Sequence, residues 1–188
     1  TRYISAMTEK RRLLLVDGSG YIFRAFFALP PMTRPDGTPV NAVFGFCSIV
    51  LRGIQDVQPD YVAACFDLPG PTFRHEQFAE YKATRQPMPD DLRAQFPRVR
   101  KVVAALRIPV YEMEGYEADD VIGTLARQAT ELGMDTLVST GDKDMAQLVN
   151  DRVTLVNTMS DTVLDPEAVE AKFGVPPERI VDYLSLMG

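Results

Sequence analysis

Short apolar runs that end on an acidic or turn-forming residue recur along this chain. Runs such as Leu13-Leu-Leu-Val16 and Val62-Ala-Ala-Cys-Phe66 are continuous rather than alternating. That pattern is typical of strands buried on both faces of a parallel sheet. The runs predict strands at residues 12–16, 61–66, 108–112, 135–140 and 152–157.

The segments between these runs carry apolar residues at helical spacing and end near Gly or Pro. They predict helices at residues 21–29, 42–57, about 90–106, 117–132 and 143–149, and two more that begin at Asp165-Pro166 and Pro176-Pro-Glu178. Asn41 is the predicted cap of helix 42–57, and Asp90 or Asp91 that of the next helix. The alternation of strand and helix predicts an α/β fold with three layers, α/β/α, around a mainly parallel central sheet.

The composition is that of an ordinary globular protein, with 46% hydrophobic and 24% charged residues among 188. This length suits one domain, predicted at residues 7–188, and Met7 resembles a natural start, so residues 1–6 are expected to be a tag or N-terminal extension. Cys47 and Cys65 both lie in apolar runs, which suggests reduced core thiols and a cytoplasmic location. No apolar run is long enough for a membrane span, so no membrane association is expected.

Charge is segregated along the chain, although the net charge is only −6. Residues 74–107 contain eight basic and four acidic residues, whereas residues 108–188 contain five basic and sixteen acidic residues. A basic strip beside an acidic pocket suits a metal-dependent nuclease, since the strip attracts phosphates and metal ions neutralise the pocket. A solvated basic helix face is the alternative interpretation of the same pattern.

Carboxylates follow the ends of the apolar runs, where parallel strands bring side chains to one edge of the sheet. Three more acids begin the helix predicted at residues 117–132. The candidate metal ligands are Asp17, Asp67, Glu117, Asp119, Asp120, Asp142 and Asp144. Each acid alone could instead be a turn former or helix cap. Their combined placement favours a site for divalent ions.

The chemistry of these side chains limits the kind of ion. Oxygen ligands favour Mg²⁺ or Mn²⁺ over zinc, and the single histidine, His75, lies outside the cluster. We expect His75 to be exposed or to contact phosphate. Two ions about 4 Å apart would generate a hydroxide and stabilise a leaving oxygen in phosphodiester hydrolysis.

Four motifs resemble those of a known family, the N-terminal 5′-nuclease domain (5′-to-3′ exonuclease or flap endonuclease) of bacterial DNA polymerase I, which has a PIN-like core. The resemblance extends from about Arg12 to Gly188. It rests on Asp17-Gly-Ser-Gly-Tyr-Ile-Phe-Arg-Ala25, on Phe66-Asp67 with Thr72-Phe-Arg-His-Glu76 and Tyr81-Lys-Ala-Thr-Arg85, on Glu114-Gly-Tyr-Glu-Ala-Asp-Asp120, and on Gly141-Asp-Lys-Asp144.

The resemblance implies a metal-dependent hydrolase that removes 5′ flaps and RNA primers in DNA replication and repair. Asp17, Asp67, Glu117 and Asp119 match its first metal group, Asp142 and Asp144 its second, and Asp120 an accessory acid. Residues 70–90 match a helical arch through which the 5′ strand passes. There Lys82 and Arg85 would act catalytically by polarising the scissile phosphate. Arg24 and Arg74 would contact phosphates, and Tyr21 or Phe23 would stack on a base.

The implied partners are DNA with a 5′ flap, nick or RNA primer and a downstream polymerase domain in the same polypeptide, in a monomer at the bacterial nucleoid. The family continues after residue 188 with further metal-ligating aspartates and a helix-hairpin-helix DNA-binding region. Residues 1–188 alone are therefore expected to cleave poorly. A PIN-type ribonuclease and a non-catalytic nucleic-acid-binding module are the alternative functions.

Overall fold

Six strands form one sheet in the order β3-β2-β1-β4-β5-β6. They are β1 (Arg12–Asp17), β2 (Tyr61–Cys65), β3 (Val110–Tyr111), β4 (Asp135–Ser139), β5 (Val153–Asn157) and β6 (Thr162–Leu164). The computed structural model describes residues 10–187, so the tag or extension expected at residues 1–6 lies outside the described residues. All neighbouring strands are parallel except β5 and β6. The predicted α/β fold with a mainly parallel central sheet is confirmed.

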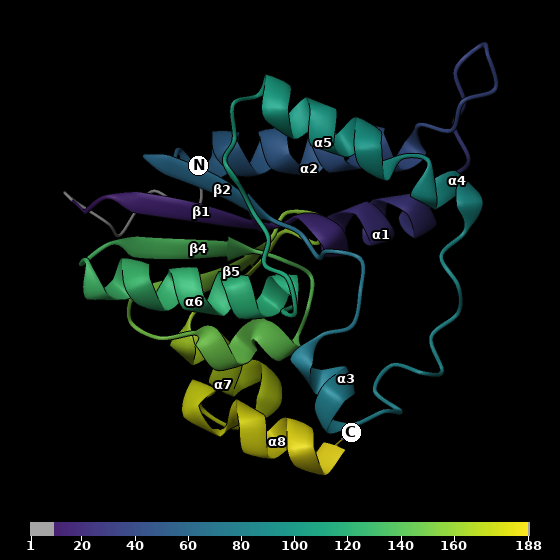
Figure 1. Cartoon of the computed structure of the whole chain (residues 1–188). Helices are drawn as coiled ribbons and strands as arrows, with labels where there is room; N and C mark the ends of the chain where they lie inside the picture. Colours follow the sequence, from purple (N-terminus) through teal and green to yellow (C-terminus); the bar gives the residue numbers. More distant parts are fainter. Residues whose placement is uncertain (1–9, 188) are drawn as a thin grey trace.

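Helices cover both faces of this sheet (Figure 1). They are α1 (Gly18–Ala28), α2 (Asn41–Val57), α3 (Phe73–Gln77), α4 (Asp90–Arg93), α5 (Phe96–Ala105), α6 (Ala118–Glu131), α7 (Pro166–Phe173) and α8 (Ile180–Met187), with 3₁₀ helices η1 (Asp144–Leu148) and η2 (Pro177–Arg179). The helices α1, α2 and α5 lie on one face, whereas α6 packs on the other. None of the helices among residues 10–187 has the length and apolar character needed to cross a membrane.

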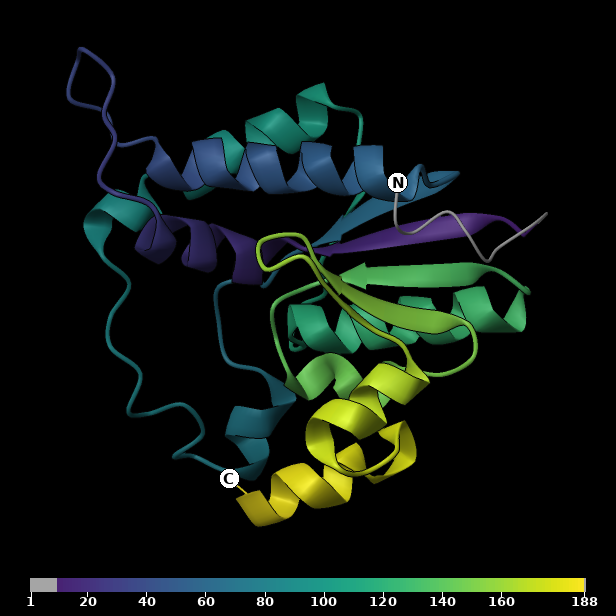
Figure 2. The same cartoon turned by 180° about the vertical axis from the view of Figure 1, so that it is seen from behind.

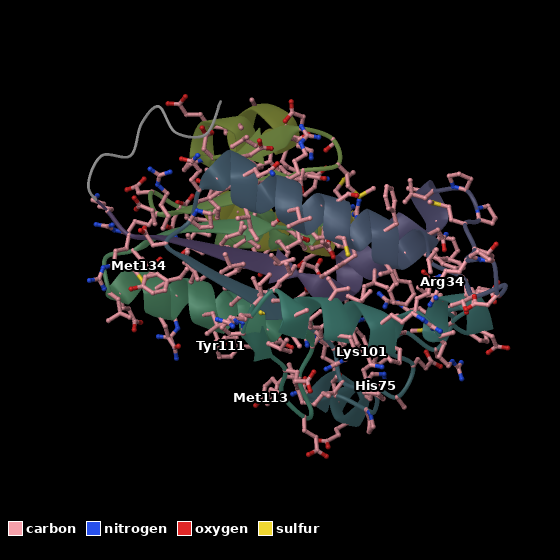
Figure 3. The ribbon with its side chains drawn as sticks, turned by 90° about the horizontal axis from the view of Figure 1, so that it is seen from above. Arg34, His75, Lys101, Tyr111, Met113 and Met134 are labelled. Atoms are coloured by element: carbon pink, nitrogen blue, oxygen red, sulfur yellow. The ribbon has the colours of Figure 1, made fainter. Side chains whose placement is uncertain are left out.

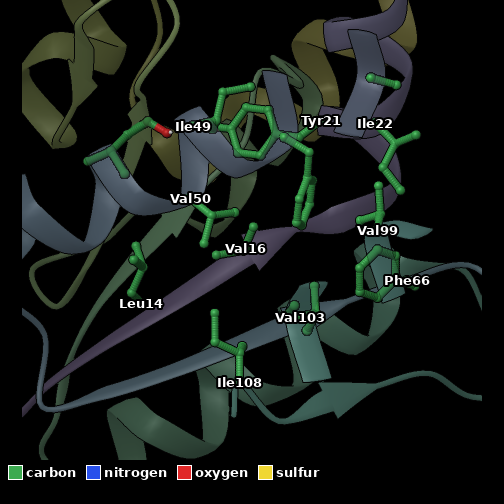
Figure 4. Close-up of a cluster of buried hydrophobic side chains, with 14 of the residues drawn as sticks. Leu14, Val16, Tyr21, Ile22, Ile49, Val50, Phe66, Val99, Val103 and Ile108 are labelled. Atoms are coloured by element: carbon green, nitrogen blue, oxygen red, sulfur yellow. Dashed lines mark hydrogen bonds between the residues drawn. The ribbon is translucent and has the colours of Figure 1, made fainter. Parts of the chain in front are cut away.

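Alternation along the central strand divides the core between the two faces. Leu14 and Val16 point toward α1, α2 and α5, where they pack with Phe46 and Val103 (Figure 4). Leu15 points to the opposite face and packs against α6. A strand with apolar residues on both faces is buried on both sides, which explains the continuous apolar runs.

Gln95 lies between α4 and α5, and the helix caps predicted at Asn41 and at Asp90 or Asp91 are wrong. Its buried side-chain oxygen accepts hydrogen bonds from the N–H groups of Ala42 (2.9 Å) and Val43 (3.2 Å), at the start of α2. Asn41 is therefore not the side-chain cap of α2; it instead donates to the carbonyl of Phe26. The helix predicted from about residue 90 begins as α4, and its N-cap is Pro89 rather than Asp90 or Asp91.

Two other differences from the predicted elements lie in the last third of the chain, at η1 and β6. The helix predicted at residues 143–149 is the 3₁₀ helix η1. Residues 162–164 form the short antiparallel edge strand β6, which the sequence pattern did not predict. A strand of three residues is too short to show a period.

Residues 70–90 leave the sheet after β2 and return at α4. Only α3 is an α-helix within this segment, and turns and extended backbone connect it to α4. Figure 2 shows the connection bowing outward between the two helices. The predicted helical arch is thus mostly non-helical among these residues.

Candidate active site

The carboxyl ends of β1, β2 and β4 lie side by side in the sheet. Asp17, the last residue of β1, is in register with Cys65 of β2, and Val16 is in register with Ser139 of β4. The chain continues from these positions to Asp67 on one side and to Asp142 on the other. Strand register therefore brings three predicted acids to one edge.

The Asp17 carboxylate is buried and held by two donors. The Gly20 N–H donates to Oδ1 at 2.8 Å, and the Thr140 hydroxyl donates to Oδ2 at 2.8 Å. A side chain at position 20 would collide with this carboxylate, which explains the glycine. Burial raises the pKa of Asp17; the two hydrogen bonds oppose this effect, while the nearby Asp67 and Asp142 add to it.

Asp67 joins the end of β2 to α1 and α6. Its Oδ1 accepts a hydrogen bond from the Ala118 N–H at 2.7 Å, at the start of α6. Its own N–H donates to the Ser19 hydroxyl at 2.9 Å. These contacts fix the start of α6, and with it Glu117 and Asp119, beside the strand ends.

Asp119 faces four other acids. Burial raises its pKa to about 7, and repulsion from Asp17, Asp142, Asp67 and Glu117 adds to the shift. Among the described residues, no donor forms a hydrogen bond to its carboxylate. This part of the site is therefore crowded with negative charge that the protein itself does not neutralise.

Glu117 and Asp120 are engaged by the segment that follows β2. Lys82 forms an ion pair with Glu117 at 2.6 Å, and the Tyr81 hydroxyl donates to the same carboxylate at 3.1 Å. Arg74 forms two hydrogen bonds to Asp120, both at 2.7 Å, which lower the pKa of that carboxyl. Asp120 also accepts from the Glu117 N–H, so both of its oxygens have protein donors.

Asp142 and Asp144 lie in the loop after β4. The Asp142 N–H donates to the Thr140 hydroxyl at 3.0 Å, and the Asp144 N–H donates to Asp142 Oδ1 at 2.9 Å. Partial burial and repulsion from Asp142 raise the pKa of Asp144. The two acids form a pair whose repulsion a cation would relieve.

The donor set fits a hard divalent cation in its chemistry, but its ligands are not arranged around a formed ion site. Across residues 10–187, no three acidic, histidine or cysteine side chains are positioned together as ligands of one ion. Lys82, Thr140 and backbone N–H groups hold several of the carboxylate oxygens instead. To bind an ion, those oxygens would have to exchange their present donors for the cation. Repulsion between the carboxylates and the preference of hard cations for oxygen ligands both favour that exchange.

Residues 12–174 match the family described as 5′-3′ exonuclease, N-terminal resolvase-like domain. This chain belongs to the 5′-3′ exonuclease family. DNA polymerase I of Pseudomonas aeruginosa is 53% identical over 94% of this chain, and the match covers 19% of that protein. The chain thus spans about a fifth of the length of that relative. The 5′-3′ exonuclease of Aquifex aeolicus is 40% identical over 95% of this chain and 62% of that protein.

A solved structure shares the fold of this exonuclease domain. The bacteriophage T5 flap endonuclease, in a pseudo-enzyme-product complex with DNA and metal ions, superposes with a TM-score of 0.72 at 19% identity. The match covers 95% of this chain and 66% of the phage protein. The resemblance to the 5′-nuclease domain of DNA polymerase I is confirmed by the family match and by the relatives of that name.

The exonuclease domain buries one of its predicted DNA contacts. Tyr21 is fully buried beneath the sheet edge, and its hydroxyl shares a hydrogen bond of 2.9 Å with Ser139. The prediction that Tyr21 stacks on a base is wrong, because no face of its ring reaches the surface. Phe23 is 37% exposed and remains the candidate for that role, and its ring packs edge-on against Phe96.

Three other predicted contacts have different surroundings. Arg24 lies over the loop after β4 and donates to the Gly141 carbonyl, next to Asp142. Arg85 is exposed on the outward segment and forms no ion pair with a described residue, so the structure does not bring it to the acids. His75 is half-buried rather than exposed, and its Nδ1 accepts the Thr72 N–H at 3.0 Å.

Sequence reasoning missed the residues that orient the acids. Ser19 and Thr140 hold Asp67, Asp17 and Asp142 through hydroxyl groups, and Tyr81 holds Glu117. The available signals were the Ser within Asp17-Gly-Ser-Gly20, the Thr directly after β4 and the Tyr preceding Lys82. Small hydroxyl residues beside a strand-end carboxylate are suitable orienting groups.

A groove of about 850 Å³ extends from the acids along the outer side of α6. Residues 111–116 and α3 line it on one side, and η1 lines it on the other. Glu117, Asp119, Asp120 and Asp144 lie at the acidic end. Its size is within the range of ligand-binding pockets.

Proposed function

We propose that this domain hydrolyses phosphodiester bonds at 5′ flaps, nicks and RNA primers of DNA, using two Mg²⁺ or Mn²⁺ ions. The observation that carries the proposal is the convergence of Asp17, Asp67, Glu117, Asp119 and Asp142 at the carboxyl edge of the sheet, in a member of the 5′-3′ exonuclease family. An edge of this kind is where α/β sheets bind ligands.

Asp17, Asp67, Glu117 and Asp119 would hold one ion, and Asp142 and Asp144 the second. When bound, such ions lower the pKa of a water molecule and stabilise the leaving oxygen. Thr140 and the Gly20 N–H keep the Asp17 carboxylate oriented, and the Ser19 hydroxyl holds the backbone N–H of Asp67. Asp120 matches the accessory acid of the family, and its two hydrogen bonds from Arg74 support that role.

Lys82 and Arg74 form ion pairs with Glu117 and Asp120 at this edge. We assign to Lys82 the role of exchanging Glu117 for an oxygen of the scissile phosphate, a charge-assisted contact that strengthens as charge develops. Arg85, Arg24 and Phe23 would contact the substrate farther from the reacting atoms. Residues 70–90 would form the arch through which the 5′ strand passes. The activity would serve DNA replication and repair in the bacterial cytoplasm, next to a polymerase in the same polypeptide.

The test is cleavage of a labelled 5′-flap duplex with Mg²⁺ by the full polypeptide that carries this domain and by its Asp119→Asn variant. Asp151→Asn is the matched control, since Asp151 is exposed in the turn before β5. The proposal expects loss of at least 100-fold in rate for Asp119→Asn and an unchanged rate for Asp151→Asn. Binding of the flap without cleavage under any divalent ion would instead support a non-catalytic binding module, and cleavage restricted to single-stranded RNA would support a ribonuclease.

A further inference from the structure

The groove along α6 continues well beyond the acids assigned to the metal ions. It begins at Glu117 and Asp119 and follows the helix to Arg127 and Gln128. At 1.5 Å per residue, the distance from position 119 to position 128 is about 14 Å. That length matches roughly four stacked bases at about 3.4 Å each.

Aromatic side chains form the wall opposite η1. Tyr111 and Tyr116 are each 45% exposed, and the Phe73 ring lies 5.4 Å from that of Tyr116. Tyr111 is the last residue of β3 and Met113 lies in the connection from β3 to α6, and Figure 3 shows both on the same edge of the molecule as His75 of α3. Single exposed apolar residues need no explanation, but aromatic rings gathered in one groove are platforms on which unpaired bases stack.

Gly123 is the one position without a side chain on the part of α6 that lines the groove. A glycine within a helix costs about 1 kcal/mol relative to alanine. Neither backbone nor packing demands it here, because its φ is not positive and a Cβ would lie 3.4 Å from Leu148, an ordinary contact. A larger side chain at position 123 would extend toward Leu148 and narrow the groove between α6 and η1.

The charges of the groove indicate which partner it suits. Arg127 at the far end is 66% exposed and pairs with Glu131 one turn away, and such an exposed pair exchanges readily for a phosphate. The acids at the near end would repel a phosphate chain until divalent ions neutralise them. Cations and rings along a path that starts at a metal centre suit a single nucleic-acid strand better than an apolar protein segment.

We infer that this groove binds the single-stranded segment of the substrate next to the reacting phosphate, with Tyr111 and Tyr116 as stacking platforms and Arg127 as a phosphate contact. The inference rests on the proposed function. Because paired bases do not expose their faces, the groove selects a single strand over a duplex. A flap of about four nucleotides fills it, whereas a flap of one nucleotide does not reach beyond Asp120.

The test compares 5′-flap duplexes with one and four unpaired nucleotides, using wild type, Tyr116→Ala and Gly123→Leu. We expect KM for the four-nucleotide flap to rise about five- to fiftyfold in both variants, and KM for the one-nucleotide flap to stay unchanged. The leucine side chain of Gly123→Leu also meets Leu148, so the Tm of this variant is measured as well, and an unchanged Tm shows that a loss of binding is not a loss of folding. Tyr61→Ala is the control, since Tyr61 is similarly exposed at the opposite end of the sheet.

A second readout is independent of cleavage. With 2-aminopurine at the third unpaired nucleotide and Ca²⁺ in place of Mg²⁺, wild type should quench the fluorescence by stacking, and Tyr116→Ala should not. Equal quenching in both proteins, or equal KM changes for both flaps, would overturn the groove assignment. Absence of cleavage by wild type would overturn the proposed function alone, because the quenching experiment would still decide the groove.

Discussion

The Asp119 carboxylate shows most clearly how the site combines burial with like charges. Asp119 is the second residue of α6, where the helix N-terminus would ordinarily stabilise an anion. Burial and four neighbouring acids outweigh that effect and raise its pKa to about 7. At physiological pH, the side chain is therefore balanced between a protonated form and a form that attracts a cation.

Asp119→Asn should change the pH dependence of stability in metal-free protein. The ordinary pKa of Asp119 is 3.8 and its pKa in the folded protein is about 7. The ionised carboxylate therefore destabilises the folded state fully above pH 7, whereas below about pH 4 the group is protonated and does not destabilise it. Allowing for partial exposure, the penalty is about 2 kcal/mol. With a chelator present, we expect the variant to gain roughly 4–8 °C in Tm over wild type at pH 8 and nothing at pH 4. Equal gains in Tm at pH 4 and pH 8 would show that ionisation of Asp119 does not destabilise the folded protein.

At the scale of elements, the segment after β2 is attached to α6 through side chains rather than through the sheet. Arg74, Tyr81 and Lys82 reach Asp120 and Glu117, and the Phe73 N–H donates to the Gly115 carbonyl at 2.9 Å. Since these contacts use the acids of the candidate site, substrate or ion binding and the position of this segment are coupled.

Arg74→Ala should loosen this attachment. The two hydrogen bonds to Asp120 are partly buried, and their loss leaves a carboxylate beside Glu117 without its cation. We expect limited proteolysis within residues 78–89 to become several-fold faster. Arg179→Ala, which removes an exposed pair with Asp182, should leave the rate unchanged. Equal rates for the two variants would mean that Arg74 does not secure the segment.

Gln95 performs a similar linking role between α5 and α2. Gln95→Met keeps the approximate volume but leaves the buried N–H groups of Ala42 and Val43 without their acceptor. We expect a loss of about 2–4 kcal/mol in the free energy of unfolding, measured by urea denaturation. Gln55→Met on the exposed face of α2 is the control and should change stability by less than about 0.5 kcal/mol. A neutral Gln95→Met would show that the remote cap is dispensable.

At the scale of the whole molecule, the sequence predicted the sheet and the edge at which the acids gather. Both follow from local patterns, namely continuous apolar runs and the residue types at their ends. The burial of Tyr21, the cap supplied by Gln95 and the pairing of Lys82 with Glu117 join positions far apart in the chain. No local period records such contacts, so they became visible only once the elements were packed.

Mn²⁺ binding followed by electron paramagnetic resonance would show whether carboxylates from separate strand ends form one centre for divalent ions. We expect wild type to bind Mn²⁺, Mg²⁺ to displace it, and Asp67→Asn and Asp119→Asn each to weaken binding at least tenfold. Asp151→Asn should bind as wild type does. Binding that is undetectable, or that both site variants leave unchanged, would show that these carboxylates do not form one ion centre.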